Sequence, residues 1–228
     1  MSASLSTIID RLVKYYGGLV RSREFLAIKA LVNGMHPVGV LISIVLTQNT
    51  SDRVAVKALE NLVRRFGRRL EPEALMRSSV DEVADLIRVS GMHRLKARTI
   101  FNILKALDGG DALLREDPER LREILTSIPG VGPKTADVFL LMFRRHPTFP
   151  VDTHIRRVLT RLGIVSEGEG YEEIRAKVMK SIDPGQYLTA HLILIKHGRE
   201  VCRARKPLCS RCPINDLCPR VGLPKTRP

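Results

Sequence analysis

Two helices meet at the stretch Ile128-Pro129-Gly130-Val131-Gly132-Pro133-Lys134-Thr135-Ala136, in which two glycines stand one residue apart. The first helix is expected to end near Ser127 and the second to begin near Pro133. Glycines at this spacing allow a tight turn with positive φ and let backbone N–H groups come close to an anion. The start of the second helix adds unpaired N–H groups and the positive end of the helix dipole. We therefore expect a hairpin between helices that holds a DNA sugar-phosphate backbone without reading the base sequence.

Lys134 falls in the first turn of that second helix, where the dipole disfavours a cation. One interpretation is a further phosphate contact, which suits any strongly basic protein. The other is a lysine of depressed pKa, whose neutral amine is available as a nucleophile, as in Schiff-base enzymes. The residues of the turn alone leave both interpretations open.

A second polar segment, Pro150-Val151-Asp152-Thr153-His154, directly precedes an amphipathic helix. An aspartate in this place is most commonly an N-cap, because its side-chain oxygen accepts from the first free N–H groups of the helix. Capping does not exclude a catalytic role for Asp152.

Helical spacing of apolar residues recurs along the rest of the chain. It is clearest in Leu59, Leu62, Val63 and Phe66, in Ala136, Phe139, Leu140 and Phe143, and in Ile155, Val158, Leu159 and Leu162. Helix starts are indicated by the capping box Ser79-Val80-Asp81-Glu82 and by Asp117-Pro118-Glu119. The run from Val38 to Leu46 is rich in Val and Ile, and we interpret it as a buried helix because no partner strand is evident. The sequence predicts an all-α fold.

All four cysteines of the chain, Cys202, Cys209, Cys212 and Cys218, lie in one C-x6-C-x2-C-x5-C segment near the C-terminus. A disulfide framework is not expected, because the chain is large enough to fold without one and lacks a secretion signal. Four thiolates at this spacing indicate a metal centre. Structural zinc usually takes paired short knuckles, whereas a cubane tolerates wider and unequal spacing. The spacing therefore favours an iron-sulfur cluster and leaves zinc open.

Charge and composition set the class of partner. The chain has 228 residues, of which 44% are hydrophobic, and 38 Lys+Arg against 24 Asp+Glu give a net charge of +14. Such a chain can bury a core, and its surplus of cations favours a polyanion as partner. The start of the sequence lacks the apolar region of a signal peptide, and no run is long enough to span a membrane. We expect an intracellular monomer, in the cytoplasm or nucleoid, without membrane contact.

Together, the glycine turn with Lys134, the Val151-Asp152-Thr153-His154 segment and the cysteine segment resemble the endonuclease III family of helix-hairpin-helix DNA glycosylases. The resemblance runs from about Val38 to Cys218. It implies two helical domains flanking a DNA-binding cleft, with the hairpin in residues 30–147 and the cluster domain in residues 1–29 plus 148–228. It also implies double-stranded DNA with damaged bases or abasic sites as the partner.

The family's chemistry would have a damaged base flipped out of the duplex before its glycosidic bond is cleaved. Lys134 matches the lysine that attacks the sugar C1′, and Asp152 matches the aspartate that stabilises positive charge on the sugar and helps activate the nucleophile. With a lysine in this place, β-elimination should follow base removal. Two alternatives stay open: a monofunctional glycosylase for mispaired thymine or uracil, and a non-enzymatic helix-hairpin-helix DNA-binding protein.

The resemblance implies further roles. Gln48 would fill the hole left by the extruded nucleotide, and Met92 would act as an apolar wedge between bases. The cysteines would hold a 4Fe-4S cluster that shapes a basic loop. Other residues expected on DNA are Gly130, Gly132, Thr135 and His154, together with Arg203, Arg205 and Lys206 of that loop.

Oxidised pyrimidines are the family's usual substrates, and two features of this sequence bear on that expectation. Ser51 stands where an acidic residue is often found beside the base pocket, and the chain has no Trp and only 4% aromatic residues. Recognition of the flipped base should therefore use little aromatic stacking. Mispaired thymine or uracil, or an oxidised purine, remain open as substrates.

Overall fold

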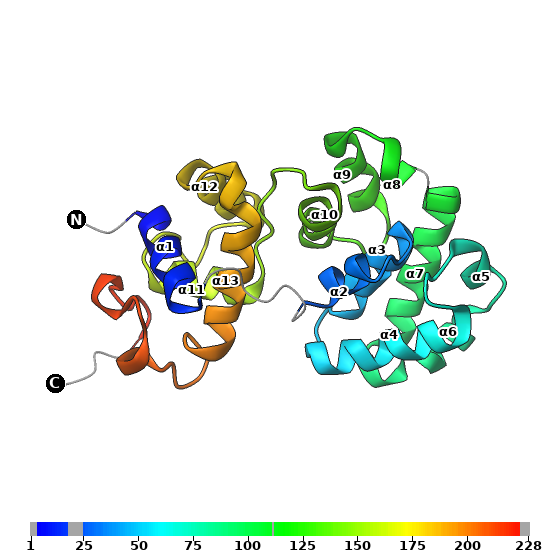
Figure 1. Cartoon of the computed structure of the whole chain (residues 1–228), viewed down its shortest axis with the longest axis horizontal. Coiled ribbons are helices and arrows are strands. Elements are labelled where there is room, and N and C mark those ends of the chain that lie inside the picture. Colours follow the sequence, from blue (N-terminus) through cyan, green and yellow to red (C-terminus); the bar gives the residue numbers. More distant parts are fainter. Residues whose placement is uncertain (1–3, 18–24, 111, 224–228) are drawn as a thin grey trace. The chain divides into compact units, whose positions relative to one another are not determined.

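The computed structural model describes residues 4–17, 25–110 and 112–223 (Figure 1). Every regular element within these ranges is a helix, so the all-α prediction is confirmed. The contacts divide the chain into two compact units, one of residues 22–146 and one of residues 1–21 with 147–228. No helix in the described ranges is both long enough and apolar enough to cross a membrane.

The unit of residues 22–146 is built around α3 (Pro37–Leu46), in which every residue from Val38 to Leu46 is buried. This confirms the buried helix predicted for the Val- and Ile-rich run, which packs against α2, α4, α7 and α10. The other elements of this unit are α2 (Leu26–Val32), α4 (Asp52–Phe66), α5 (Pro72–Met76), α6 (Val80–Leu86), η2 (Arg88–Ser90), α7 (His93–Leu107), η3 (Asp108–Gly110), α8 (Ala112–Arg115), α9 (Pro118–Ser127), α10 (Pro133–Phe139) and η4 (Leu140–Arg144).

Both predicted helix starts in this unit are confirmed. The Ser79 hydroxyl accepts from the Glu82 N–H, and α6 begins at the next residue. The Asp117 carboxylate accepts from two N–H groups of α9, whose first residue is Pro118. Side-chain caps of this kind satisfy N–H groups that have no partner within the helix.

The unit of residues 1–21 and 147–228 joins both ends of the chain. Its elements are α1 (Leu5–Tyr15), α11 (Thr153–Arg161), α12 (Tyr171–Ser181), η5 (Pro184–Gln186), α13 (Tyr187–Glu200), η6 (Cys209–Arg211) and η7 (Asn215–Leu217). Helix α13 packs against α1 and α11 (Figure 1). The Arg11 guanidinium on α1 donates to Asp216 at 2.6 Å, which ties the N-terminal helix to the cysteine segment.

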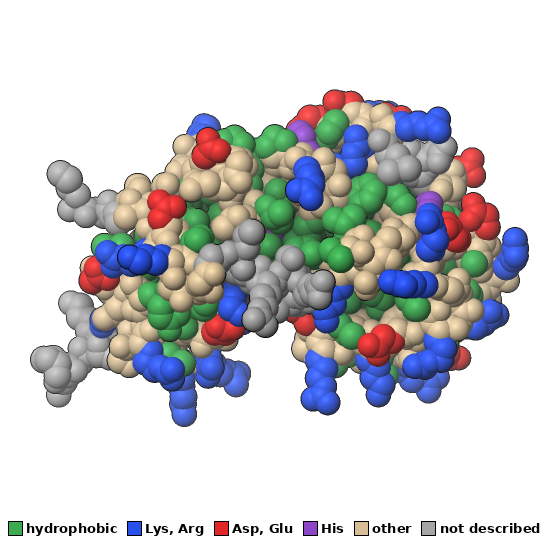
Figure 2. All heavy atoms as spheres, in the orientation of Figure 1, with side chains coloured by type: hydrophobic (Ala, Val, Ile, Leu, Met, Phe, Trp, Pro, Cys, Tyr) green, Lys and Arg blue, Asp and Glu red, His purple; other side chains and the backbone are tan. Residues whose placement is uncertain are grey.

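The first boundary between the units differs from the one expected at residues 29 and 30. That division would cut through α2, whereas α2 packs as a whole on α3 and α4. Its residues Leu26, Ala27, Ile28 and Ala30 are all buried, so the helix stays with residues 22–146. Lysine and arginine side chains, with acidic ones among them, are scattered over the visible surface of both units (Figure 2).

Candidate functional site

The predicted turn lies between α9 and α10, with Gly132 as the N-cap of α10. Gly130 has φ +96°, and a Cβ added there would come within 2.0 Å of the Thr99 Oγ1 atom on α7. Glycine is therefore required at position 130 both by the backbone angle and by the close approach of α7. The Asn102 side chain, also on α7, donates to the Pro129 carbonyl at 3.1 Å. The turn is thus held in shape by α7.

Lys134 is the second residue of α10 and is half-buried. One turn further on, the Asp137 carboxylate is completely buried and accepts from Arg122 of α9 through Nε at 2.8 Å and Nη2 at 3.1 Å. A two-point pair of this kind is directional. The pair fixes α10 against α9 and thereby sets the position of the helix that carries Lys134.

Gln48 follows the end of α3 and reaches the turn. Its Nε2 donates to the Gly130 carbonyl at 3.3 Å and to the Thr135 hydroxyl at 3.1 Å. The structure therefore brings together three of the residues predicted to contact DNA. Thr135 is only 3% exposed, so its hydroxyl holds Gln48 and does not reach the surface.

Met92 is the N-cap of α7, has φ +48° and is 52% exposed. Two further apolar side chains of the same region, Val89 and Leu95, are also exposed. The Asn49 amide nitrogen lies 3.7 Å from the Met92 Sδ atom. An exposed methionine beside exposed aliphatic side chains gives the apolar tip that a wedge between bases needs.

Asp152 is the N-cap of α11, and its Oδ1 accepts from the Ile155 N–H at 2.7 Å. The predicted capping role is confirmed. Two residues on, His154 Nδ1 lies 3.1 Å from the Arg157 guanidinium, which can only donate. Burial lowers the pKa of His154, and the positive charges of Arg157 and Arg199 lower it further, against the opposing effects of Asp152 and of a hydrogen bond to the Gly198 backbone. The shift favours the neutral ring, and because Nδ1 accepts from Arg157 the proton of that neutral ring is on Nε2.

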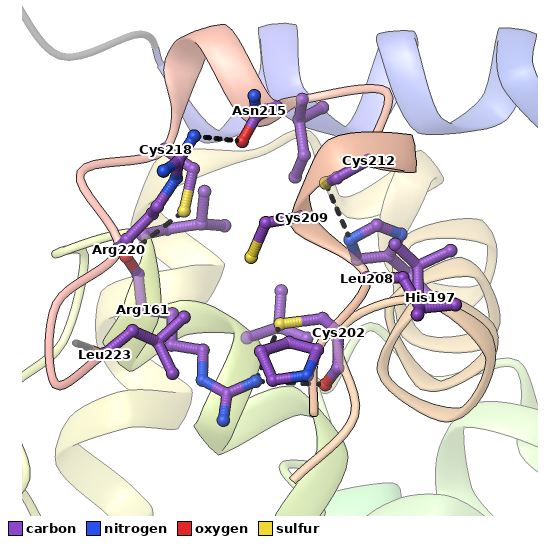
Figure 3. A pocket seen from close by; sticks show the side chains of 15 residues that line it. Arg161, His197, Cys202, Leu208, Cys209, Cys212, Asn215, Cys218, Arg220 and Leu223 are labelled. Carbon is purple, nitrogen blue, oxygen red and sulfur yellow. Dashed lines mark hydrogen bonds between the residues drawn. The ribbon is translucent and has the colours of Figure 1, made fainter. Parts of the chain in front are cut away.

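The four cysteines line one pocket in the unit of residues 1–21 and 147–228 (Figure 3). The rest of the lining is largely aliphatic and includes Val158, Leu162, Leu208 and Ile214. Across the described ranges, no three His, Cys, Asp or Glu side chains converge closely enough for a single metal ion. Four thiols around one apolar pocket form a donor set that a cubane cluster takes.

Burial raises the pKa of the Cys212 thiol to about 11 and also raises that of Cys218. The Cys212 and Cys218 thiols are therefore protonated at pH 7 until a metal binds, and metal binding must release their protons. The surrounding polar groups are suited to the thiolates that result. The buried Arg161 places its Nη1 3.3 Å from the Cys202 sulfur, and His197 Nε2 lies 3.7 Å from that of Cys212.

The loop between the first two cysteines is anchored by α11. Arg161 donates to the carbonyls of Arg203 at 2.6 Å and Ala204 at 3.1 Å, and Arg157 donates to that of Cys202 at 3.0 Å. Arg203, Arg205 and Lys206, the cations predicted to contact phosphate, are all exposed. The anchoring arginines thus lie inside while the loop's own cations face solvent.

Sequence reasoning missed Thr99, Asn102, Arg122 and Arg161. Each acts through a partner far away in the chain, and helical periodicity carries no information about such partners. Of these four residues, Arg161 is the one that the sequence could have indicated, because it is a cation on the apolar face of the helix that carries Ile155, Val158 and Leu162.

Two family models match this chain. The model of the HhH-GPD superfamily of base excision DNA repair proteins matches residues 42–184, and that of the iron-sulfur binding domain of endonuclease III matches residues 202–218. The first match spans more than half of the sequence and contains the turn, Lys134 and Asp152. The chain belongs to the HhH-GPD superfamily of base excision DNA repair proteins.

Known members of the superfamily agree in sequence and in structure. Endonuclease III of Sulfolobus acidocaldarius is 37% identical over 78% of this chain and 79% of its own. A non-covalent endonuclease III–DNA complex superposes with a TM-score of 0.79 at 29% identity, covering 94% of this chain and 93% of the other. A trapped covalent endonuclease III–DNA intermediate gives 0.78 at 28% identity, covering 93% and 92%.

As a member of the HhH-GPD superfamily with these relatives, the chain is a DNA glycosylase. Its cofactor is a 4Fe-4S cluster, in keeping with the match to the iron-sulfur binding domain, which begins at Cys202 and ends at Cys218. The resemblance stated from the sequence motifs is confirmed.

Proposed function

We propose that this glycosylase is bifunctional: it removes a damaged base from double-stranded DNA and then cleaves the strand as an abasic-site lyase. The observation that carries the proposal is Lys134 in the first turn of α10, on a helix fixed by the Arg122–Asp137 pair and preceded by the Gly130 turn. The first turn of α10 also places Lys134 at the positive end of the helix dipole. A neutral amine is what an attack on a sugar carbon requires.

The chemistry starts when the Lys134 amine attacks C1′ of the flipped nucleotide and the glycosidic bond breaks, its electron pair leaving with the base. One proton of the Lys134 nitrogen passes to the departing base. The C1′–O4′ bond then breaks, O4′ takes up the second nitrogen proton, and an imine between the Lys134 nitrogen and C1′ results. Loss of a C2′ proton then expels the 3′ phosphate by β-elimination. The negatively charged carboxylate of Asp152 stabilises the positive charge that develops on the sugar. This interaction strengthens toward the transition state.

Contacts to the duplex are assigned to further residues, all but His154 in the unit of residues 22–146 that also carries Lys134. Gln48 fills the space left by the extruded nucleotide, with Thr135 and the Gly130 carbonyl holding its amide before DNA binds. Met92 enters between neighbouring bases as the wedge. The N–H groups around Gly130 and Gly132 receive phosphate oxygens. His154, at the start of α11, donates from Nε2 to DNA.

In this proposal Cys202, Cys209, Cys212 and Cys218 hold the 4Fe-4S cluster. When bound, the cluster supplies a cross-link that closes the segment of residues 202–218. Arg203, Arg205 and Lys206 then contact phosphates from the loop that Arg161 and Arg157 anchor.

Oxidised pyrimidines are the proposed substrates. Ser51 is exposed and is the N-cap of α4, so the position beside the expected base pocket carries a small polar group and not a carboxylate. Mispaired thymine or uracil and oxidised purines are the competing substrates that the test below includes.

The proposal is tested with 32P-labelled duplexes that each contain one lesion: an oxidised pyrimidine, a mispaired thymine or uracil, or an oxidised purine. The wild type should release the oxidised pyrimidine and leave a strand with a 3′ unsaturated aldehyde. Lys134→Ala should lose both steps, and Asp152→Asn should slow base release by at least about 10²-fold. A strand that stays intact until heated in alkali would show a monofunctional glycosylase, and no base release from any duplex would contradict the proposal.

A further inference from the structure

Lys96, on α7, is a buried cation for which the proposed chemistry has no use. Its side chain is only 2% exposed, and burial lowers its pKa. Its Nζ donates to the Leu46 carbonyl at 3.1 Å and to the Ser90 carbonyl at 2.9 Å. A buried ammonium is costly unless it is hydrogen-bonded, so its place here calls for an explanation.

The two acceptors of Lys96 are the last residues of two different elements. Leu46 is the last residue of α3 and Ser90 is the last residue of η2. Carbonyls at helix ends have no N–H donor within the helix. They also carry the negative end of the helix dipole, which a cation stabilises. A single ammonium therefore bridges the ends of two elements that are distant in sequence.

The same two carbonyls stand directly before the two segments expected to enter DNA. Gln48 comes two residues after Leu46, and Met92 comes two residues after Ser90. Both segments contain a left-handed residue, with φ +51° at Asn49 and +48° at Met92. Residues in this region of φ persist only where their surroundings hold them. The Asn49–Met92 contact at 3.7 Å joins the same segments on the outside.

We propose that Lys96 is a positioning residue that fixes the Gln48 and Met92 segments to each other, so that both enter the duplex as one rigid unit. The inference rests on the proposed roles of Gln48 and Met92. Lys96 itself does not touch DNA, because it is buried beneath both segments. Removing its N–H donors leaves two buried carbonyls without a partner and frees the segments to move independently.

The test compares one lyase reaction that needs duplex opening with one that does not. Single-turnover rates are measured on an abasic site in a duplex and on the same abasic strand alone. Lys96→Met keeps the length of the side chain but has no donor, and it should lower the ratio of duplex rate to single-strand rate by about 10-fold or more. Lys105→Met removes an exposed lysine from the same helix and should keep the wild-type ratio.

A ratio within about two-fold of wild type in a folded Lys96→Met protein would overturn the inference. The ratio is insensitive to partial unfolding, because an unfolded fraction lowers both rates equally. Should Lys96→Met not fold, Lys96→Gln takes its place: the shorter amide reaches one carbonyl at a time, so the ratio should still fall, and a wild-type ratio would count against the bridge.

Combined variants separate this inference from the proposed function beneath it. Gln48→Ala with Met92→Ala should lower the duplex ratio, and adding Lys96→Met should lower it no further. If the double variant has a wild-type ratio, the assigned roles of Gln48 and Met92 are wrong. If the double variant lowers the ratio and Lys96→Met multiplies that loss, the roles stand and the positioning by Lys96 is refuted.

Discussion

At the scale of single residues, the turn before α10 requires that residue 130 carry no Cβ atom. Thr99 occupies the space that this atom would fill, and φ at Gly130 lies in the range that L side chains rarely adopt. Gly132, two residues on, has neither constraint: nothing lies within 4 Å of its Cβ position, and its φ is −87°. Glycine is therefore required at position 130 by backbone angle and by space, whereas neither requires it at position 132.

Gly130→Ala should lower the free energy of unfolding by at least about 2 kcal/mol, because both the strained φ and the contact with Thr99 oppose the alanine. Gly132→Ala is the matched control and should change it by less than about 0.5 kcal/mol. Thermal denaturation of the holoprotein measures both. Equal melting temperatures for the two variants would contradict the account of the turn.

Residue-level roles were predictable where they are local. The glycine turn and the caps at Ser79, Asp117 and Asp152 follow from rules that act within four residues. Thr99 and Lys96 could not be predicted, since each acts on a segment remote in sequence and looks like an ordinary residue of an amphipathic helix.

At the scale of elements, the position of Lys134 depends on how α10 packs against α9. Asp137 is completely buried on α10, and Arg122 supplies two of its hydrogen bonds. A buried carboxylate that loses its cation is far less stable than either the intact pair or an apolar replacement. The pair therefore serves to fix the helices relative to each other.

Arg122→Met should destabilise the fold by about 3 kcal/mol or more, since it leaves the Asp137 carboxylate buried without this partner. Arg120→Met removes the partner of an exposed ion pair on the same helix, with Glu123 at 2.7 Å, and should cost less than about 1 kcal/mol. Melting temperatures compare the two. The account is wrong if Arg120→Met is the more damaging substitution.

The cysteine segment is the other element that needs an organising contact. Cys212→Ser should lose iron and the visible absorbance of the cluster, and its affinity for duplex DNA should fall by about 10-fold or more as the loop of Arg203, Arg205 and Lys206 loses its shape. Ser210→Ala changes an exposed neighbour and serves as control. A Cys212→Ser protein with full iron content would exclude Cys212 as a ligand.

The sequence pattern predicts where a helix lies, but it does not predict to which unit that helix belongs. The helix over Val38–Leu46 was predicted although its residues are apolar on all sides, because no partner strand was available. The boundary placed at residues 29 and 30 was misplaced, since nothing local in α2 shows that it packs on α3 and α4.

At the scale of the whole molecule, the net charge of +14 is unevenly distributed. Residues 199–228 hold eight Lys+Arg against two Asp+Glu, and both units expose further cations (Figure 2). The chain is expected to bind duplex DNA as a monomer through phosphate contacts from each unit. Contacts of this type release counterions and weaken as salt is added.

Affinity for an undamaged duplex should fall at least about 10²-fold between roughly 50 and 200 mM salt, which corresponds to about four or more phosphate contacts. A fluorescence anisotropy titration at several salt concentrations gives the slope. Arg205→Ala should reduce the magnitude of that slope by the amount that corresponds to about one phosphate contact. A dissociation constant that does not depend on salt would contradict phosphate binding.

In the proposed mechanism Lys134 forms a covalent imine with the sugar of damaged DNA. Borohydride reduces such an imine to a stable amine, so the wild-type protein should become cross-linked to an abasic duplex in the presence of borohydride. Mass spectrometry of the digested complex should place the sugar on Lys134. Lys134→Ala should give no cross-link, while Lys105→Ala should trap like the wild type. A wild-type protein that yields no adduct, or a Lys134→Ala protein that traps equally well, would contradict the claim.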